Sequence, residues 1–141
     1  MTRERVVFDT NVLISGALSA SSTPAAALEW AVTHDQLLAS TATLLELMET
    51  LWSSKFDPYV TRNDREMLLQ RLAPLVEIIE IVQSNQASRD SRDDKFLEAA
   101  VNGRASVLVT GDRDLLSLHP FRGVAILTPA AYLERASQRE P

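Results

Sequence analysis

Short apolar runs alternate with amphipathic stretches along the whole chain. Five runs rich in Val, Ile, Leu and Phe have the length of strands, at 5–9, 36–40, 76–82, 106–110 and 124–128. The intervening patterns predict helices over 11–20, 25–34, 42–52, 64–75, 94–103, 112–119 and 129–137. Strands alternating with helices indicate a parallel sheet covered by helices on both faces, an α/β/α sandwich.

Residues with strong local preferences mark several of these boundaries. Pro24 and Pro129 suit the first turns of the second and the last helix. Ser40 or Thr41 can cap the third helix, and we expect Gly103 to close the fifth as a C-terminal cap. The third apolar run alternates with polar residues, which is typical of an edge strand.

The composition is that of a globular protein without cysteine chemistry. Its 141 residues are 45% hydrophobic and 23% charged, and no repeat or linker interrupts them, so we expect one domain over 1–141. The absence of cysteine excludes disulfides and thiolate-bound metal centres, and His34 and His119 lie far apart. No signal peptide is apparent, and no apolar run approaches the roughly 20 residues that span a bilayer. We therefore expect a cytoplasmic protein.

The charge balance says little about partners by itself. The formal net charge is −5, which does not indicate a polyanion-binding protein. A cluster of acids neutralised by a metal ion would nevertheless make that number misleading. Apart from Lys55 and Lys95 the basic residues are all Arg, which suits bidentate phosphate contacts, although codon bias explains the preference equally well.

Carboxylates follow the apolar runs where strands are expected to end. Asp9 directly follows the first run, and Asp112 and Asp114 directly follow the fourth. Asp93 and Asp94 begin the helix after the third run. Ligands of parallel sheets bind outside the carboxyl ends of the strands, where the strand order reverses, so these acids are candidates for one site.

A further acid comes from the helix after the second strand. Glu46 is surrounded by apolar positions, whereas its rival Glu49 resembles a surface residue. Each acid alone has a plainer explanation, as a helix cap or a solvated side chain. Together they would repel one another unless a cation compensates, and oxygen ligands suit Mg²⁺ or Mn²⁺. Such a site can activate water for attack on phosphorus.

Four motifs in order resemble the PIN-domain ribonuclease family. They are VVFDTNVLIS (6–15), STATLLELMETL (40–51), RDDKFLEAAV (92–101) and LVTGDRDLL (108–116). The similarity extends from Val6 to about Leu133 and is greatest to the VapC-like branch of toxins from toxin–antitoxin pairs. It implies a five-stranded parallel sheet of order 3-2-1-4-5, which places the first and fourth strands side by side.

The resemblance also implies a role for individual residues. The catalytic and metal-binding acids would be Asp9, Glu46, Asp94 and Asp112. Asp93 is the alternative in the third motif and Asp114 in the fourth. Asn11 and Thr110 match polar positions that orient the acids or the attacking water.

The implied activity is metal-dependent hydrolysis of phosphodiester bonds in single-stranded RNA, leaving a 5′-phosphate and a 3′-hydroxyl. The cofactor would be Mg²⁺ or Mn²⁺, and the partners a second copy of the chain and a small antitoxin covering the site. Candidate RNA-binding residues, for which ordinary surface charge is an equal explanation, are Arg89, Arg92, Lys95 and Arg113. We expect target specificity to depend on 53–64 and 83–92.

Two alternatives remain open. A haloacid-dehalogenase-like phosphatase also begins with a strand and an Asp, but it requires a second Asp where this chain has Asn11, and a lysine later than Lys95. A PIN-like RNA-binding or scaffold module without catalysis is the other alternative. Its weakness is that all four acid positions are filled.

Overall fold

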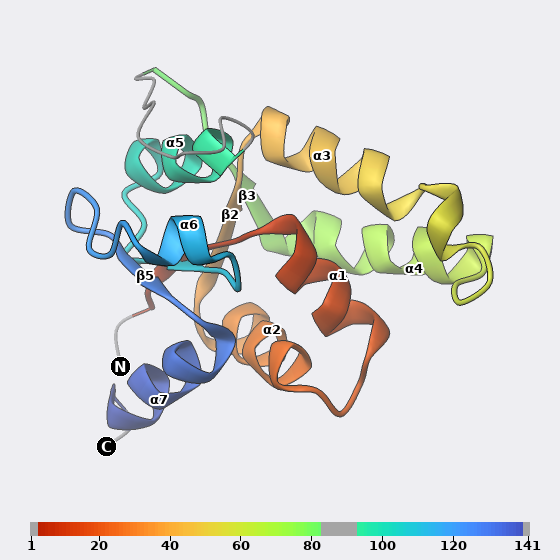
Figure 1. The fold of residues 1–141 in the computed structure, drawn as a ribbon, viewed down its shortest axis with the longest axis horizontal. Helices are drawn as coiled ribbons and strands as arrows, with labels where there is room; N and C mark the ends of the chain where they lie inside the picture. Colours follow the sequence, from red (N-terminus) through yellow and green to blue (C-terminus); the bar gives the residue numbers. More distant parts are fainter. Residues whose placement is uncertain (1–2, 83–92, 140–141) are drawn as a thin grey trace.

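The structure is a computed structural model that describes residues 3–82 and 93–139. A parallel five-stranded sheet forms its centre, with the order β3-β2-β1-β4-β5 (Figure 1). The strands are β1 (Arg5–Phe8), β2 (Gln36–Ala39), β3 (Val76–Ile78), β4 (Val107–Val109) and β5 (Ala125–Leu127). The predicted sandwich and strand order are thus confirmed.

Helices cover both faces of this sheet (Figure 1). They are α1 (Thr10–Leu18), α2 (Thr23–His34), α3 (Thr41–Leu51), α4 (Arg62–Leu72), α5 (Asp94–Asn102), α6 (Arg113–Leu116) and α7 (Pro129–Arg139), with 3-10 turns η1 (Ser54–Phe56) and η2 (Ala73–Leu75). Alternation along β1 divides the core, because Val6 and Phe8 pack with α1, α2, α4 and α7 while Val7 packs with α5 and α6. No helix in the described residues is long and apolar enough to span a membrane.

Three predicted elements differ from the structure by more than two residues at one end. β3 is shorter than 76–82 because its neighbour β2 ends at Ala39, and the last bond between them joins the Ile79 N–H to the Ala39 carbonyl at 2.7 Å. The fourth helix ends at Leu72, before η2, which contains a proline. α6 covers only 113–116 of the expected 112–119.

Gly103 caps α5 as predicted, but for a different physical reason. Its φ is −86°, so it does not adopt the left-handed conformation of a typical glycine cap. A Cβ at this position would lie 2.8 Å from the Ala99 carbonyl oxygen and 2.8 Å from the Leu38 side chain. Glycine is therefore needed for close packing, and Arg104, with φ 55°, makes the left-handed turn.

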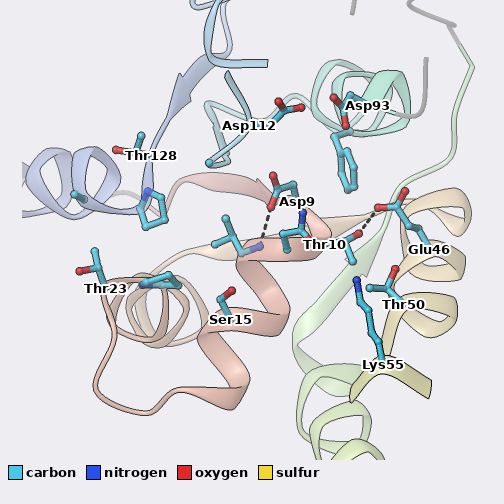
Figure 2. A pocket seen from close by; sticks show the side chains of 17 residues that line it. Asp9, Thr10, Ser15, Thr23, Glu46, Thr50, Lys55, Asp93, Asp112 and Thr128 are labelled. Atoms are coloured by element: carbon cyan, nitrogen blue, oxygen red, sulfur yellow. Dashed lines mark hydrogen bonds between the residues drawn. The ribbon is translucent and has the colours of Figure 1, made fainter. Parts of the chain in front are cut away.

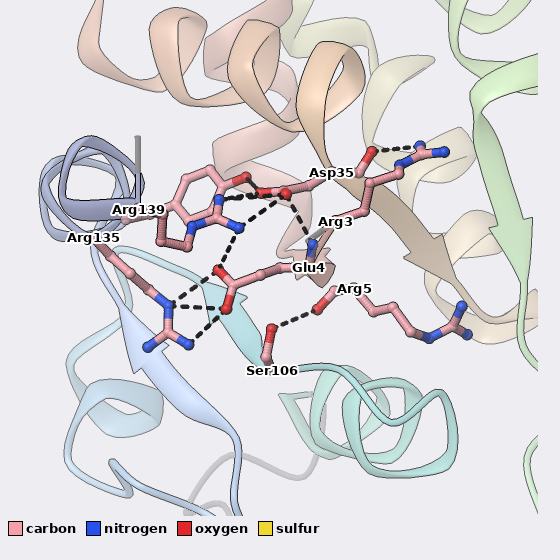
Figure 3. Close-up of polar contacts among 8 residues, drawn as sticks. Arg3, Glu4, Arg5, Asp35, Ser106, Arg135 and Arg139 are labelled. Carbon is pink, nitrogen blue, oxygen red and sulfur yellow. Dashed lines mark hydrogen bonds and ion pairs between the residues drawn. The ribbon is translucent and has the colours of Figure 1, made fainter. Parts of the chain in front are cut away.

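A buried polar cluster fixes α7 at the amino ends of the strands (Figure 3). Asp35 is 1% exposed and accepts hydrogen bonds from the Tyr132 hydroxyl at 2.6 Å and the Glu4 N–H at 2.9 Å. Arg139 pairs with Asp35 at 3.1 Å, and Arg135 pairs with Glu4 at 2.7 Å. We call these five residues the α7 clamp.

The charges of the α7 clamp balance one another. Burial alone would raise the pKa of Glu4, but the hydrogen bonds and charge of Arg135, with the charge of Arg139, outweigh it and hold the pKa below its ordinary value. Burial and the hydrogen bond to Asp35 raise the pKa of the Tyr132 hydroxyl, which stays protonated and donates. The clamp thereby sets the position of α7, whose first turn follows β5 and lies at the carboxyl ends of the strands.

Candidate active site

Asp9 lies at the junction of β1 and α1. Its backbone N–H still pairs with the Val109 carbonyl of β4, at 3.0 Å, while its side chain caps α1 through a 2.8 Å bond accepted from the Val12 N–H. The other carboxylate oxygen accepts a hydrogen bond from the Thr110 hydroxyl, 2.5 Å away. The adjacency of β1 and β4 therefore brings the polar residues after each strand into direct contact.

Thr110 connects Asp9 to the next acid. Its side chain is fully buried, and its hydroxyl oxygen accepts the Asp112 N–H at 3.0 Å while donating to Asp9. Asp112 in turn caps α6 by accepting the Asp114 N–H at 3.1 Å. One hydroxyl thus orients the Asp9 carboxylate and the loop that carries Asp112.

Glu46 is held from two sides. The Thr10 hydroxyl donates to one carboxylate oxygen at 2.5 Å, and the Lys95 ammonium pairs with the other at 2.8 Å. Thr10 is buried, whereas the Glu46 and Lys95 side chains are about a quarter exposed, at 25% and 27%. These contacts join α1, α3 and α5 around a single carboxylate.

These acids line one open pocket of about 910 Å³ (Figure 2). Its carboxylates are Asp9, Glu46, Asp93 and Asp112. Within the described lining, Lys55 is the one basic residue. Side chains carrying a hydroxyl or carboxamide complete the polar lining: Thr10, Asn11, Ser15, Thr23, Thr50 and Thr128. The first turn of α7, which the clamp positions, forms part of the wall through Pro129 and Ala130.

The structure distinguishes the two acids of the third motif. Asp93 immediately precedes α5 and lines the pocket. Asp94, the predicted ligand, is 8% exposed and does not belong to the pocket lining. The arrangement thus favours Asp93, the alternative, as the third acid of the pocket.

Of the remaining predicted residues, some line the pocket and others lie outside it. Asn11 lines the pocket, whereas Asp114 and Arg113 on α6 do not. Lys95 contacts Glu46. The predicted RNA-binding residues Arg89 and Arg92 lie outside the described residues.

Thr10 and Lys55 are among the pocket residues that were not predicted from the sequence. Thr10 directly follows the predicted acid Asp9. The sequence feature that could have identified it is a hydroxyl at the start of a helix that must pack against the sheet. Lys55 belongs to the stretch expected to determine specificity, but nothing in its sequence context selected it.

Burial raises the pKa of Asp9 above its ordinary value. The hydrogen bonds from Thr110 and Val12 oppose this effect, and the negative charges of Asp112 and Glu46 add to it. An ionised Asp9 is therefore costly in the protein alone and favourable beside a cation. This is the electrostatic environment expected of a metal ligand.

The donor chemistry of the pocket fits a hard divalent ion. All the candidate ligands are oxygens, which Mg²⁺ and Mn²⁺ prefer over the nitrogen and sulfur ligands of softer ions. Among the residues described, no three carboxylate or imidazole side chains lie close enough together to form a complete metal site. The carboxylates share one pocket, so side-chain movements toward an ion would be required to complete a site.

The fold and the pocket define an α/β domain with carboxylates at the reversal point of a parallel sheet. A family model described as PIN domain matches residues 5–114. The chain therefore belongs to the PIN-domain family, whose members are generally nucleases. The family resemblance found in the sequence motifs is thus confirmed. A search of curated proteins found no match.

Solved structures share this fold at low sequence identity. PAE2754 from Pyrobaculum aerophilum is 22% identical, with a TM-score of 0.64 over 96% of this chain and 91% of that chain. VapBC2 from Rickettsia felis, bound to a DNA fragment from its promoter, is 14% identical, with a TM-score of 0.60 over 86% and 96%. FitAcB from Neisseria gonorrhoeae is 16% identical, with a TM-score of 0.54 over 89% and 98%.

Proposed function

We propose that this protein is a metal-dependent endoribonuclease that hydrolyses phosphodiester bonds in single-stranded RNA. The observation that carries the proposal is the convergence of Asp9, Glu46, Asp93 and Asp112 on one pocket from four different parts of the chain. Such a cluster is unfavourable without a cation and useful with one. Membership of the PIN-domain family supports a nuclease over the phosphatase alternative.

The chain's own residues have separable tasks in this reaction. Bound Mg²⁺ or Mn²⁺ would supply charge stabilisation at the phosphate and lower the pKa of a water molecule. Thr110 holds Asp9 and the Asp112 loop, and Thr10 with Lys95 holds Glu46, so that the carboxylates are oriented before the substrate binds. A lining carboxylate accepts the proton of the attacking water.

The bond changes follow from this assignment. The water oxygen forms a bond to phosphorus as the bond from phosphorus to the 3′ oxygen breaks. The products are a 5′-phosphate and a 3′-hydroxyl, which takes up a proton from solvent. No covalent intermediate with the protein is required.

The biological role we propose is that of a toxin in a toxin–antitoxin pair. VapBC2 and FitAcB share the fold of this chain and are named as toxin–antitoxin complexes, which supports this assignment. The partners would be RNA, a second copy of the chain and a small antitoxin that covers the pocket. We treat residues 1–141 as a single nuclease domain and place it in the cytoplasm, where these partners would be found.

An RNase assay with and without Mn²⁺ tests the activity. We expect cleavage of single-stranded RNA to require the ion, to stop with EDTA and to leave 5′-phosphate ends. p-Nitrophenyl phosphate serves as the phosphatase control, and its hydrolysis in place of RNA cleavage would refute the assignment. RNA binding without cleavage at any metal concentration would instead support the scaffold alternative. Co-purification with the product of a neighbouring antitoxin gene would test the toxin role.

A further inference from the structure

Lys55 is the basic residue in the described lining of an otherwise acidic pocket. It lies on η1, just beyond the end of α3, and its side chain is directed from there into the pocket (Figure 2). The other lysine, Lys95, is engaged in an ion pair with Glu46. No carboxylate of the described residues pairs with Lys55, whose one recorded partner is the ring of Phe56, 5.1 Å from the ammonium.

The turn that carries Lys55 is anchored on both sides. On one side, the guanidinium of Arg65 lies 5.4 Å from the centre of the Trp52 ring. On the other, Arg65 pairs with Asp57 at 2.9 Å, although Arg65 itself is only 6% exposed. Phe56 packs against the main core cluster. These contacts hold the turn that carries Lys55, while the Lys55 side chain itself is exposed.

The described lining of the pocket favours one route for a negatively charged strand. Glu46 and Thr50 lie one turn apart on the same face of α3, and the chain then continues to Lys55. The opposite side of the pocket carries the hydroxyls of Ser15, Thr23 and Thr128 and no charged residue among those described. Among the described lining residues, a phosphate next to the scissile one would therefore find a cation only along α3.

We propose that Lys55 is a substrate-binding residue that contacts the RNA phosphate adjacent to the scissile phosphate. This inference rests on the proposed ribonuclease function. It implies that the RNA backbone runs along α3, with its uncharged sugar and base groups on the hydroxyl-lined side. The ammonium acts as a point charge, so arginine at this position retains the contact.

Salt dependence of RNA binding measures this contact directly. In an Asp112→Asn background with Mg²⁺, fluorescence anisotropy of a labelled single-stranded RNA is recorded at several salt concentrations. Loss of one phosphate contact lowers the slope of log K against log salt by about 0.7, which is about a fivefold loss of affinity at 0.1 M salt. We expect Lys55→Met to show this change and Lys55→Arg to retain the slope.

Arg122 offers a matched control. It is exposed, lies over its neighbour Phe121 at 5.4 Å and does not line the pocket, so it is, like Lys55, an exposed cation beside an aromatic ring. Its φ of 49° favours Asn as the replacement. Arg122→Asn removes the same charge and should leave the slope unchanged. An equal change in both variants would mean that only net charge matters, and would overturn the assignment of Lys55.

Cleavage kinetics separate this proposal from the proposed function. In the otherwise unaltered enzyme, Lys55→Met should raise KM about fivefold with kcat within about twofold, because the contact is made before and during the reaction. Metal-dependent cleavage with KM and salt slope unchanged by Lys55→Met would overturn the Lys55 assignment alone. The predicted slope change in a protein that never cleaves RNA would support Lys55 and refute the hydrolysis.

Discussion

Replacing Asp9 by Asn separates its proposed role as a metal ligand from its role as a helix cap. Asn is as good an N-cap as Asp, so its carboxamide oxygen can still accept the Val12 N–H, which is 2.8 Å away in the native protein. The pKa of Asp9 is raised by burial and by neighbouring negative charges. A carboxyl with a raised pKa imposes no cost below its unfolded pKa and destabilises the fold as the pH rises through its folded pKa.

Asp9→Asn should therefore have opposite effects on stability in the metal-free and in the metal-bound protein. Each unit of pKa elevation corresponds to about 1.4 kcal/mol, and each kcal/mol shifts the Tm of a domain this size by roughly 4 °C. Without metal at neutral pH, the variant should melt a few degrees above the wild type. Saturating Mn²⁺, at about 100 times its Kd, should stabilise the wild type by about 2.7 kcal/mol, or roughly 10 °C. The variant should gain little and lose cleavage by roughly 100-fold or more.

Calorimetry with and without Mn²⁺, alongside the RNase assay, tests both halves of this prediction. Glu4→Gln in the α7 clamp is the matched control, because the pKa of Glu4 is lowered and its ionised form stabilises the fold above its unfolded pKa. That variant loses the 2.7 Å pairing with Arg135 and should be destabilised by about 1–3 kcal/mol while keeping its response to Mn²⁺. If Asp9→Asn melted no higher than the wild type without metal and gained equally from Mn²⁺, Asp9 would be only a helix cap and the reasoning would be refuted.

Three further predictions concern the residues around these two sites. Thr110→Val removes the hydroxyl that donates to Asp9, so urea unfolding should show a loss of about 1–3 kcal/mol, with cleavage reduced as well; an unchanged stability would contradict the bridging role. Tyr132→Phe removes the bond to Asp35 and should cost about 1.5–3 kcal/mol in urea unfolding while KM and kcat stay as in the wild type. Metal ligands must be deprotonated, so the raised pKa of Asp9 predicts that the half-saturating Mn²⁺ concentration in the cleavage assay rises as the pH falls from about 8 to about 5. A concentration that is independent of pH would count against Asp9 as a ligand.

The sequence is most informative where a residue's position follows from strand order alone. Asp9 and Asp112 come directly after β1 and β4, which are neighbours, so placing the strands already brings these acids together. Glu46 shares its helix with Glu49, and both its apolar neighbours and the family resemblance favoured it over Glu49. The structure connects Glu46 to Thr10 and Lys95 and leaves Glu49 exposed.

Positions that depend on one residue of register, or on a turn, could not be predicted in this way. Asp93 and Asp94 are adjacent at a helix start, where successive side chains point about 100° apart, and the family resemblance favoured the one that lies outside the pocket lining. Lys55 depends on the turn after α3, whose direction is set by Arg65, ten residues further along the chain. Such contacts between side chains have no periodic signal in the sequence.

The two polar clusters of this protein differ in how their charges are balanced, and this difference separates structure from function. In the α7 clamp, Asp35 and Glu4 face Arg135 and Arg139, so a buried and a partly buried acid meet two bases of the same chain. In the pocket, four carboxylates share a lining in which Lys55 is the one base among the described residues, with Lys95 paired to Glu46 from the side. The first arrangement lowers the pKa of Glu4, whereas the second leaves that of Asp9 raised. At one end of the sheet the chain neutralises its acids with its own arginines, and at the other it leaves carboxylates in excess. The excess at the second end can be balanced by a bound metal ion, which is the reason for assigning the metal and the reaction to the pocket.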